Sequence, residues 1–156
     1  MGRSPNKLES YLDFFENQFP NLDKVAIAIS SSSVGWHIAH SFNVLQKVIE
    51  SSIKSDPYSY KMNFNWKRTY IFFIGRIPRG KGKAPQAVQP KDAISEQSLK
   101  EQLLKVKSLI ADFSKLSAKS YFTHPYFGDL NKKQTLYFLE LHTYHHLKII
   151  KDIISS

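Results

Sequence analysis

Residues 139–150 read LELHTYHHLKII, and this stretch decides the fold. Its apolar residues recur at intervals of three and four, which predicts an amphipathic α-helix. The spacing of four places His142 and His146 one above the other on one helix face, and the same face carries Leu139, Ile149 and Ile153. A buried imidazole without a partner is costly, and a bound divalent metal ion would satisfy two of them at once.

The rest of the chain supplies helices against which this one can pack. Apolar periodicity predicts three earlier helices, over residues 7–18, 34–54 and 62–75. The aromatic and β-branched residues of the last segment leave a strand as its alternative. Ser98 with Glu101 forms a capping-box pattern that predicts another long helix. Asn131 with Gln134 predicts the start of the final helix, which should extend to about Ile154.

Three connections break this helical pattern. Residues 24–33 are ambiguous, because a β-prone run is followed by four serines that look like a loop before a helix. Residues 76–90 read RIPRGKGKAPQAVQP, and their Pro, Gly and cationic content predicts an irregular segment. Residues 117–130 are expected to be a linker.

Three long amphipathic helices and a shorter first one predict an all-α fold, namely a four-helix bundle. We expect an extra short helix and a long basic loop to lie between its second and third helices. The length of 156 residues predicts a single domain over residues 1–156.

Composition narrows the function classes. The chain contains no cysteine, so disulfides, thiolate metal sites and a cysteine nucleophile are excluded, and a metal would need nitrogen or oxygen ligands. Neither an apolar leader nor a run of transmembrane length is present, which predicts a soluble cytoplasmic protein without a membrane partner. The net charge of +9 is typical either of a generic basic surface or of a protein that attracts anions.

A third metal ligand would have to come from the helix over residues 34–54, which offers His37 and His40. Catalytic metal sites commonly use three protein ligands and keep one position open. On a helical wheel His37 lies closer to the apolar stripe and His40 lies at its edge, so the wheel does not settle the choice. His145 flanks the pair and could orient a ligand from outside the coordination sphere.

Four segments carry a resemblance to a known family. They are WHIAH at 36–40, PRGKGKAP at 78–85, HPYFG at 124–128 and HxxHH at 142–146. Their order and spacing resemble the DinB-like/YfiT superfamily of metal-binding helical bundles, in a branch of unknown function. The resemblance implies His40, His142 and His146 as the metal ligands. His37, which the helical wheel prefers, and His145 stay as alternatives.

The resemblance also implies what such a site does. Related proteins are metal-dependent hydrolases or thiol-dependent transferases, so we expect a divalent metal, zinc or nickel, and a low-molecular-weight thiol as a further cofactor. It implies a homodimer acting on a small-molecule substrate. Many relatives continue His-Arg-Gly-Gln after the last histidine pair, whereas this chain continues Leu147-Lys148-Ile149.

Residues outside the triad are candidates for supporting roles. His124, held before Pro125, could carry a proton over a pocket or could fix its loop to the helices by a hydrogen bond. Candidate contacts for an anionic cosubstrate are Arg76, Arg79, Lys81 and Lys83. Two alternatives stay open: a non-catalytic helical bundle, and a basic nucleic-acid-binding module, which is less favoured because no recognition motif is present.

Overall fold

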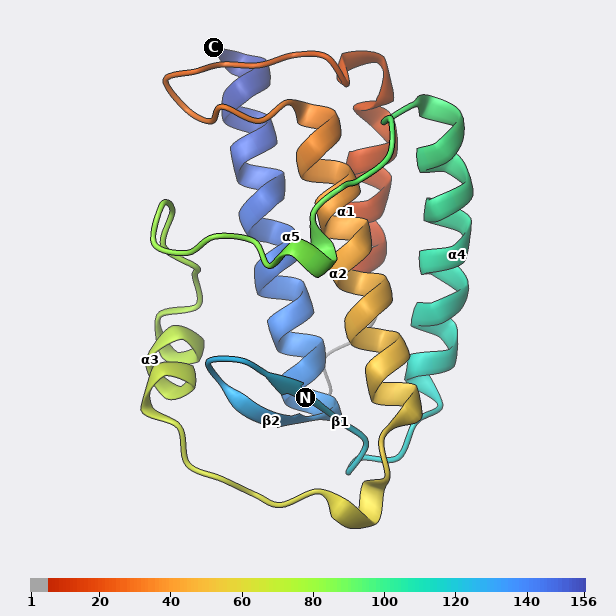
Figure 1. The fold of residues 1–156 in the computed structure, drawn as a ribbon, viewed down its shortest axis with the longest axis vertical. Helices are drawn as coiled ribbons and strands as arrows, with labels where there is room; N and C mark the ends of the chain where they lie inside the picture. The colour runs from red at the N-terminus through yellow and green to blue at the C-terminus, as the bar shows by residue number, and fades with distance from the viewer. Residues whose placement is uncertain (1–5) are drawn as a thin grey trace.

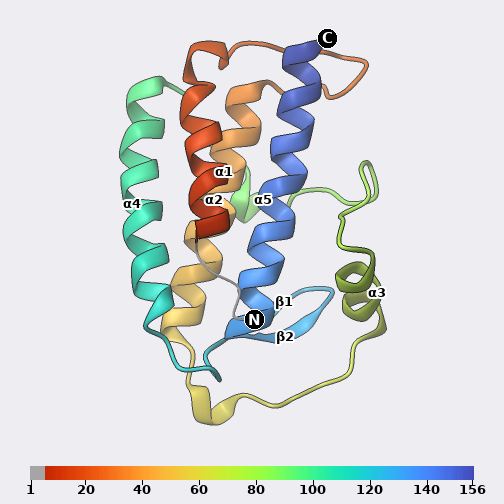
Figure 2. The ribbon, with the colours of Figure 1, turned by 180° about the vertical axis from the view of Figure 1, so that it is seen from behind.

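The computed structural model describes residues 6–156. Residues 1–5, which contributed to the expectation that the chain has no leader, lie outside the described residues. Its four long helices run side by side (Figures 1 and 2): α1 (Asn6–Asn17), α2 (Val34–Lys54), α4 (Glu96–Ser114) and α5 (Lys132–Ser155). A shorter helix, α3 (Trp66–Ile74), stands beside α5. Single 3-10 turns are η1 (Phe19–Asn21), η2 (Pro57–Ser59) and η3 (Gln86–Val88). The mainly helical character expected from the sequence is confirmed.

Side-chain caps determine where the long helices begin. Asn131 accepts a hydrogen bond from the Gln134 amide, and the Gln134 side chain accepts one from the Asn131 amide, as expected for the start of α5. The predicted start of α4 is wrong. Ser95 and Ser98 exchange the two capping bonds there, each at 3.1 Å, whereas Glu101 accepts from a side chain within the helix. Helix α4 therefore begins three residues earlier than the Ser98 pattern suggests.

The segment expected to be a plain linker contains a β-hairpin, so the fold is not purely α-helical. Strands β1 (Tyr121–His124) and β2 (Gly128–Asn131) pair antiparallel, with Tyr121 opposite Asn131 and His124 opposite Gly128. The three-residue loop between them, residues 125–127, is followed by Gly128, whose φ of +68° lies in the left-handed region that such loops require. The hairpin packs across the end of α2 and the beginning of α5 (Figure 1).

The two ambiguous segments have clear structures. Residues 24–33 form turns with one isolated bridge between Ala26 and Ser30, and no regular strand. The aromatic segment forms helix α3 rather than a strand, because Asn65 caps its first turn and Gly75 ends it at a φ of +65°. Among residues 6–156, no helix has both the length and the apolar character needed to cross a bilayer.

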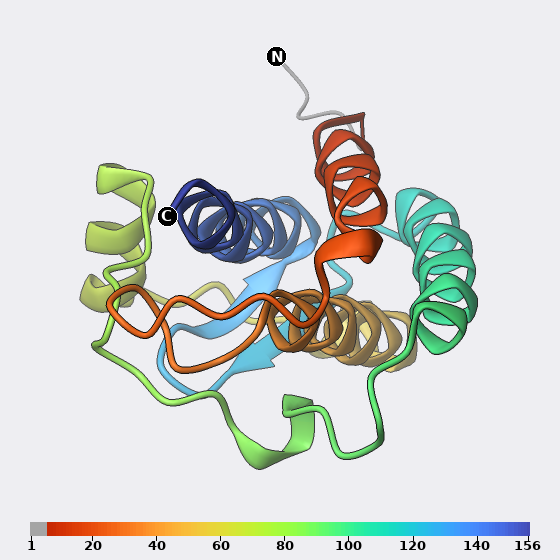
Figure 3. The ribbon, with the colours of Figure 1, turned by 90° about the horizontal axis from the view of Figure 1, so that it is seen from above.

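Helix α2 lies at the centre of the core. It packs against α4 on one side and α5 on the other, while α1 packs against α5 and α4. Seen from above, α3 lies on the opposite side of α5 from α4 (Figure 3). The fully buried apolar side chains of α2 are Val34, Ile38, Phe42, Leu45 and Ile49. Because α2 and α5 are in direct contact, polar residues on their facing sides are brought together.

Helix α3 is fastened to the hairpin and to α5. The Arg68 guanidinium is buried and donates to the carbonyl oxygens of Phe127 and Asp129 in the hairpin. The Tyr137 hydroxyl on α5 donates to the Phe72 carbonyl at 3.0 Å. These bonds fix the start of the basic segment, residues 76–90, relative to α5.

Candidate metal site

Three histidines meet where α2 faces α5. His40 on α2 and His142 and His146 on α5 each bring one nitrogen within 4.8 Å of the other two. Nε2 of His40 lies 3.3 Å from Nε2 of His142. His40 and His146 are buried, at 3% and 7% exposure. The structure therefore groups the three histidines that the family resemblance singles out.

The Nδ1 atom of His40 contacts the main chain of a distant segment. It lies 3.0 Å from the carbonyl oxygen of Val88 in η3, so Nδ1 must carry the proton and donate it. In the neutral ring the lone pair is then on Nε2, which is the nitrogen facing His142. The Trp36 indole stacks on the same ring with centroids 4.9 Å apart. Both contacts hold His40 in the orientation that a metal ligand needs.

His146 has an outer partner of its own. Its Nδ1 lies 2.9 Å from Nδ1 of His37, and Nε2 of His37 lies 3.0 Å from the Ser30 hydroxyl oxygen. If His146 uses Nε2 as a ligand, its Nδ1–H donates to His37, and the Nε2–H of His37 donates to Ser30. Metal-ligating histidines usually donate their second N–H in this way. His37, the ligand that the helical wheel preferred, is thus placed as a partner of His146.

The surroundings of His142 bear on whether a metal ion fits this site. Within residues 6–156 its buried Nδ1 has no hydrogen-bond partner, so the ring gains little from the protein around it. Two nitrogen ligands at about 2.0–2.1 Å from one tetrahedral ion would stand roughly 3.3 Å apart. The observed separation between His40 and His142 is 3.3 Å. This agreement concerns the pair His40 and His142, and the nitrogens of all three histidines lie within 4.8 Å of one another. The all-imidazole donor set is compatible with a divalent ion.

Burial keeps the triad neutral. Desolvation is the largest cause in each case, and it lowers the pKa of His40 and takes the pKa of His142 and His146 well below the ordinary value of 6.5. The neighbouring imidazoles lower the pKa of His142 and His146 further. The pKa of His37 falls to about 4 for the same reasons. Neutral imidazole is the form that binds metal, so near pH 7 no proton has to leave these rings first.

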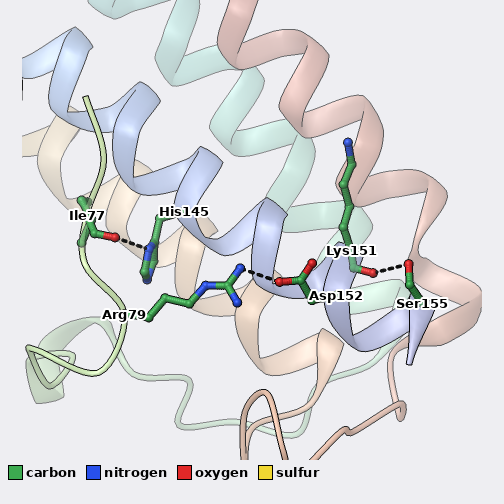
Figure 4. A network of polar contacts seen from close by, with 6 residues as sticks. All are labelled: Ile77, Arg79, His145, Lys151, Asp152 and Ser155. Carbon is green, nitrogen blue, oxygen red and sulfur yellow. Dashed lines mark hydrogen bonds and ion pairs between the residues drawn. The ribbon is translucent and has the colours of Figure 1, made fainter. Parts of the chain in front are cut away.

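His145 faces another part of the protein. Its Nδ1 donates to the Ile77 carbonyl at 3.1 Å, on the segment that follows α3 (Figure 4). Its ring meets His146 edge-on with centroids 5.0 Å apart. His145 therefore lies next to the triad but holds the connection rather than completing the group of three.

His124, the candidate proton carrier, supports the hairpin turn. Its Nδ1 accepts hydrogen bonds from the amides of Tyr126 and Phe127 at 3.0 and 3.2 Å. The ring stacks on Phe127 at 4.3 Å and meets Phe138 edge-on at 4.9 Å. Burial lowers the pKa of His124 to about 4. The hydrogen bonds of His124 thus stay within the hairpin turn, and its contact with α5 is the ring contact with Phe138 rather than a hydrogen bond.

The four candidate anion contacts do not lie together. Arg76 and Arg79 line a pocket beside α5, and Arg79 pairs with Asp152 at 2.7 Å (Figure 4). Lys81 and Lys83 are exposed and do not line that pocket. Within the described chain, the group formed by His40, His142 and His146 contains none of these cations.

Two partners of the triad have no distinctive sequence signal. Val88 contributes its main-chain carbonyl, which any residue could supply, and it lies 48 positions from His40. Ser30 is one of four consecutive serines, and nothing in the run distinguishes it from the other three. The signals for this site were the HxxxH spacing of His142 and His146 and the WHIAH segment.

The comparisons with known proteins identify a family. Residues 12–152 match the model of a family described as a protein of unknown function, DUF1569. Neither the curated proteins nor the solved structures include a match. The matched region includes all of α2 and the three histidines. The chain therefore belongs to the DUF1569 family of proteins of unknown function.

Proposed function

We propose that this protein binds one divalent metal ion through His40, His142 and His146. The observation that carries the proposal is the convergence of three imidazole nitrogens within 4.8 Å, on two packed helices. Such ligands suit zinc, nickel, copper and iron, and the resemblance favours zinc or nickel. The bond from His40 to Val88 and the contact between His146 and His37 support the proposal, because they orient two of the three rings.

The proposed site is of the catalytic type. Structural zinc sites are almost always closed by four protein ligands, whereas catalytic sites use three and keep a position for water or substrate. Within residues 6–156 the cluster contains three members, all uncharged, and no carboxylate. When bound there, a divalent ion would lower the pKa of a coordinated water or polarise a substrate carbonyl. The protein's part is to hold three neutral rings in place and to bury them.

The resemblance to the DinB-like/YfiT superfamily is part of the proposal. It is supported by the four long helices that run side by side, and by ligands drawn from α2 and α5. We propose on this basis a four-helix bundle that acts as a metal-dependent hydrolase or a thiol-dependent transferase, as a homodimer. A fold shared with such enzymes does not by itself choose the reaction.

Metal content of the purified protein tests the site. Tag-free protein is incubated with zinc or nickel, desalted and analysed for its elements, beside the variants His142→Ala and His145→Ala. We expect about one metal per chain in the parent and in His145→Ala, and none in His142→Ala. His145 is the matched control because it is an adjacent histidine outside the triad. Full metal content in His142→Ala would refute the assignment of ligands.

A second measurement separates an open site from a closed one. Cobalt(II) replaces the metal, and its visible absorption is followed while azide or a small thiol is added. An open position predicts a saturable change in the spectrum, because the added ligand enters the coordination sphere. An unchanged spectrum would show a closed, structural site and would contradict the catalytic part of the proposal.

A further inference from the structure

A pocket of about 510 Å³ lies on the flank of α5, away from the face that carries the triad. One wall is the end of α3 with the segment from Gly75 to Arg79, and the other is α5 from Leu141 to Lys148. None of the three proposed metal ligands lines it. It is therefore a second place where this protein could hold a small molecule.

The walls of the pocket are tied together. His145 on α5 donates to the Ile77 carbonyl at 3.1 Å, and Arg79 pairs with Asp152 of α5 at 2.7 Å (Figure 4). Below them, the Tyr137 hydroxyl donates to Phe72 at the end of α3. The Arg79 pair is exposed and adds little stability by itself. Three attachments in succession nevertheless keep this segment against α5 and define the pocket.

The lining combines positive charge with apolar surface. Arg76, Arg79 and Lys148 contribute cations, and the lining includes no carboxylate among the described residues. Asp152 lies nearby and is paired with Arg79. Within residues 6–156, Arg76 and Lys148 form no ion pair. The apolar side is formed by Ile74, Ile77 and Leu141, with the rings of Tyr70 and Tyr144.

The charges of residues 61–91 also favour an anionic ligand in this pocket. Every charged residue from Lys61 to Lys91 is a cation, so the wall built from this segment brings no negative charge to the pocket. On the opposite wall, Lys148 lies over the Tyr144 ring, with Nζ 5.6 Å from its centroid. Guanidinium groups match carboxylate and phosphate oxygens geometrically, and an apolar cavity wall adds affinity for an organic body.

We propose that this pocket binds a small organic anion. Its carboxylate or phosphate group contacts Arg76 and Lys148, and its apolar body lies against Leu141 and Tyr144. The proposal does not depend on the metal site, because the residues that carry it lie outside the triad.

Calorimetric titration of the full, metal-free chain tests the proposal with three probes: phenyl phosphate, benzoate and inorganic phosphate. We expect one saturable site that binds phenyl phosphate or benzoate at least tenfold more tightly than inorganic phosphate. The stronger of the two organic probes identifies the preferred anionic group. Comparable affinity for inorganic phosphate would overturn the proposed apolar contact.

Two matched double variants distinguish binding in the pocket from general attraction to the positive charge of the protein. Arg76→Gln with Lys148→Gln should weaken binding at least tenfold, whereas Lys81→Gln with Lys83→Gln should change it less than twofold. Both pairs remove two exposed cations, so a thermal melt should show both proteins folded. Equal losses in the two pairs would show diffuse attraction and refute the pocket.

Discussion

Acid should destabilise this protein through His124, which is held neutral in the fold. Its Nδ1 accepts two amide hydrogen bonds in the hairpin turn, and a protonated ring would lose that acceptor. Burial lowers its pKa from 6.5 to about 4. The unfolded chain therefore binds more protons than the folded one between these values. Stability contributed by His124 is complete above pH 6.5 and decreases as the pH falls toward 4.

The size of the loss follows from the two pKa values. Between pH 7.5 and pH 5, a shift from 6.5 to about 4 corresponds to a loss of about 2 kcal/mol of unfolding free energy. Part of the residue borders solvent, so the expected loss is between about 1 and 2 kcal/mol. The variant His124→Asn provides the comparison, because an asparagine side-chain oxygen can accept the same turn bonds and does not titrate.

Urea denaturation at pH 7.5 and pH 5, with metal removed beforehand, measures the effect. The parent should lose between about 1 and 2 kcal/mol more than His124→Asn over this interval. The variant should be the less stable protein at pH 7.5, since it lacks the ring that packs on Phe127 and Phe138. The other five histidines titrate in both proteins and cancel in the comparison. Parallel losses in the two proteins would refute the neutral, turn-holding role of His124.

Three further substitutions, the last with a control, test the contacts of His37 and of the hairpin. His37→Phe should keep one metal per chain but weaken its affinity by about 10- to 100-fold in competition with a chromophoric chelator, because the triad loses an outer partner; unchanged affinity would contradict that role. Arg68→Met should lower the unfolding free energy by about 2 kcal/mol in urea, because hairpin carbonyls lose a buried donor; a loss under about 0.5 kcal/mol would count against it. Gly128→Ala should cost about 1–2 kcal/mol, since φ is +68° and a Cβ would lie 3.0 Å from Asn63 Oδ1. Gly80→Ala is the control, because Gly80 has a φ of +71° and a Cβ there would have no neighbour within 4 Å. Its smaller expected cost measures the backbone strain alone. Equal costs of the two substitutions would contradict a clash with Asn63.

Long periodic segments were predictable, and short ones were not. Helix α2 has the bounds 34–54 that its apolar spacing predicts, and α5 begins at the cap that Asn131 and Gln134 suggest. The hairpin escaped prediction because four-residue strands carry too little periodicity to stand out. The α4 start was missed because two overlapping patterns, Ser95 with Ser98 and Ser98 with Glu101, compete, and the sequence does not rank them.

The candidate site, too, was only partly predictable from the sequence. A spacing of four placed His142 and His146 on one face, and a motif rather than helical geometry selected His40 over His37. In the structure both α2 histidines are buried, at 4% for His37 and 3% for His40, so a wheel that ranks residues by burial could not separate them. Their roles differ through tertiary contacts: Val88 meets His40, and His146 meets His37. Those contacts join residues up to 109 positions apart.

The connection from α3 to α4 is fastened by imidazoles near both of its ends. His145 holds the Ile77 carbonyl, and His40 holds the Val88 carbonyl, to which Asn43 also donates. A connection of this kind opens by local unfolding, far more often than the whole protein unfolds. Each opening at Val88 would release His40 to exchange its ring proton between nitrogens, and so to present a protonated Nε2. In the metal-free protein such an opening would interrupt the orientation of His40, so we expect the affinity of the proposed site for an ion to depend on this connection as well as on the three rings.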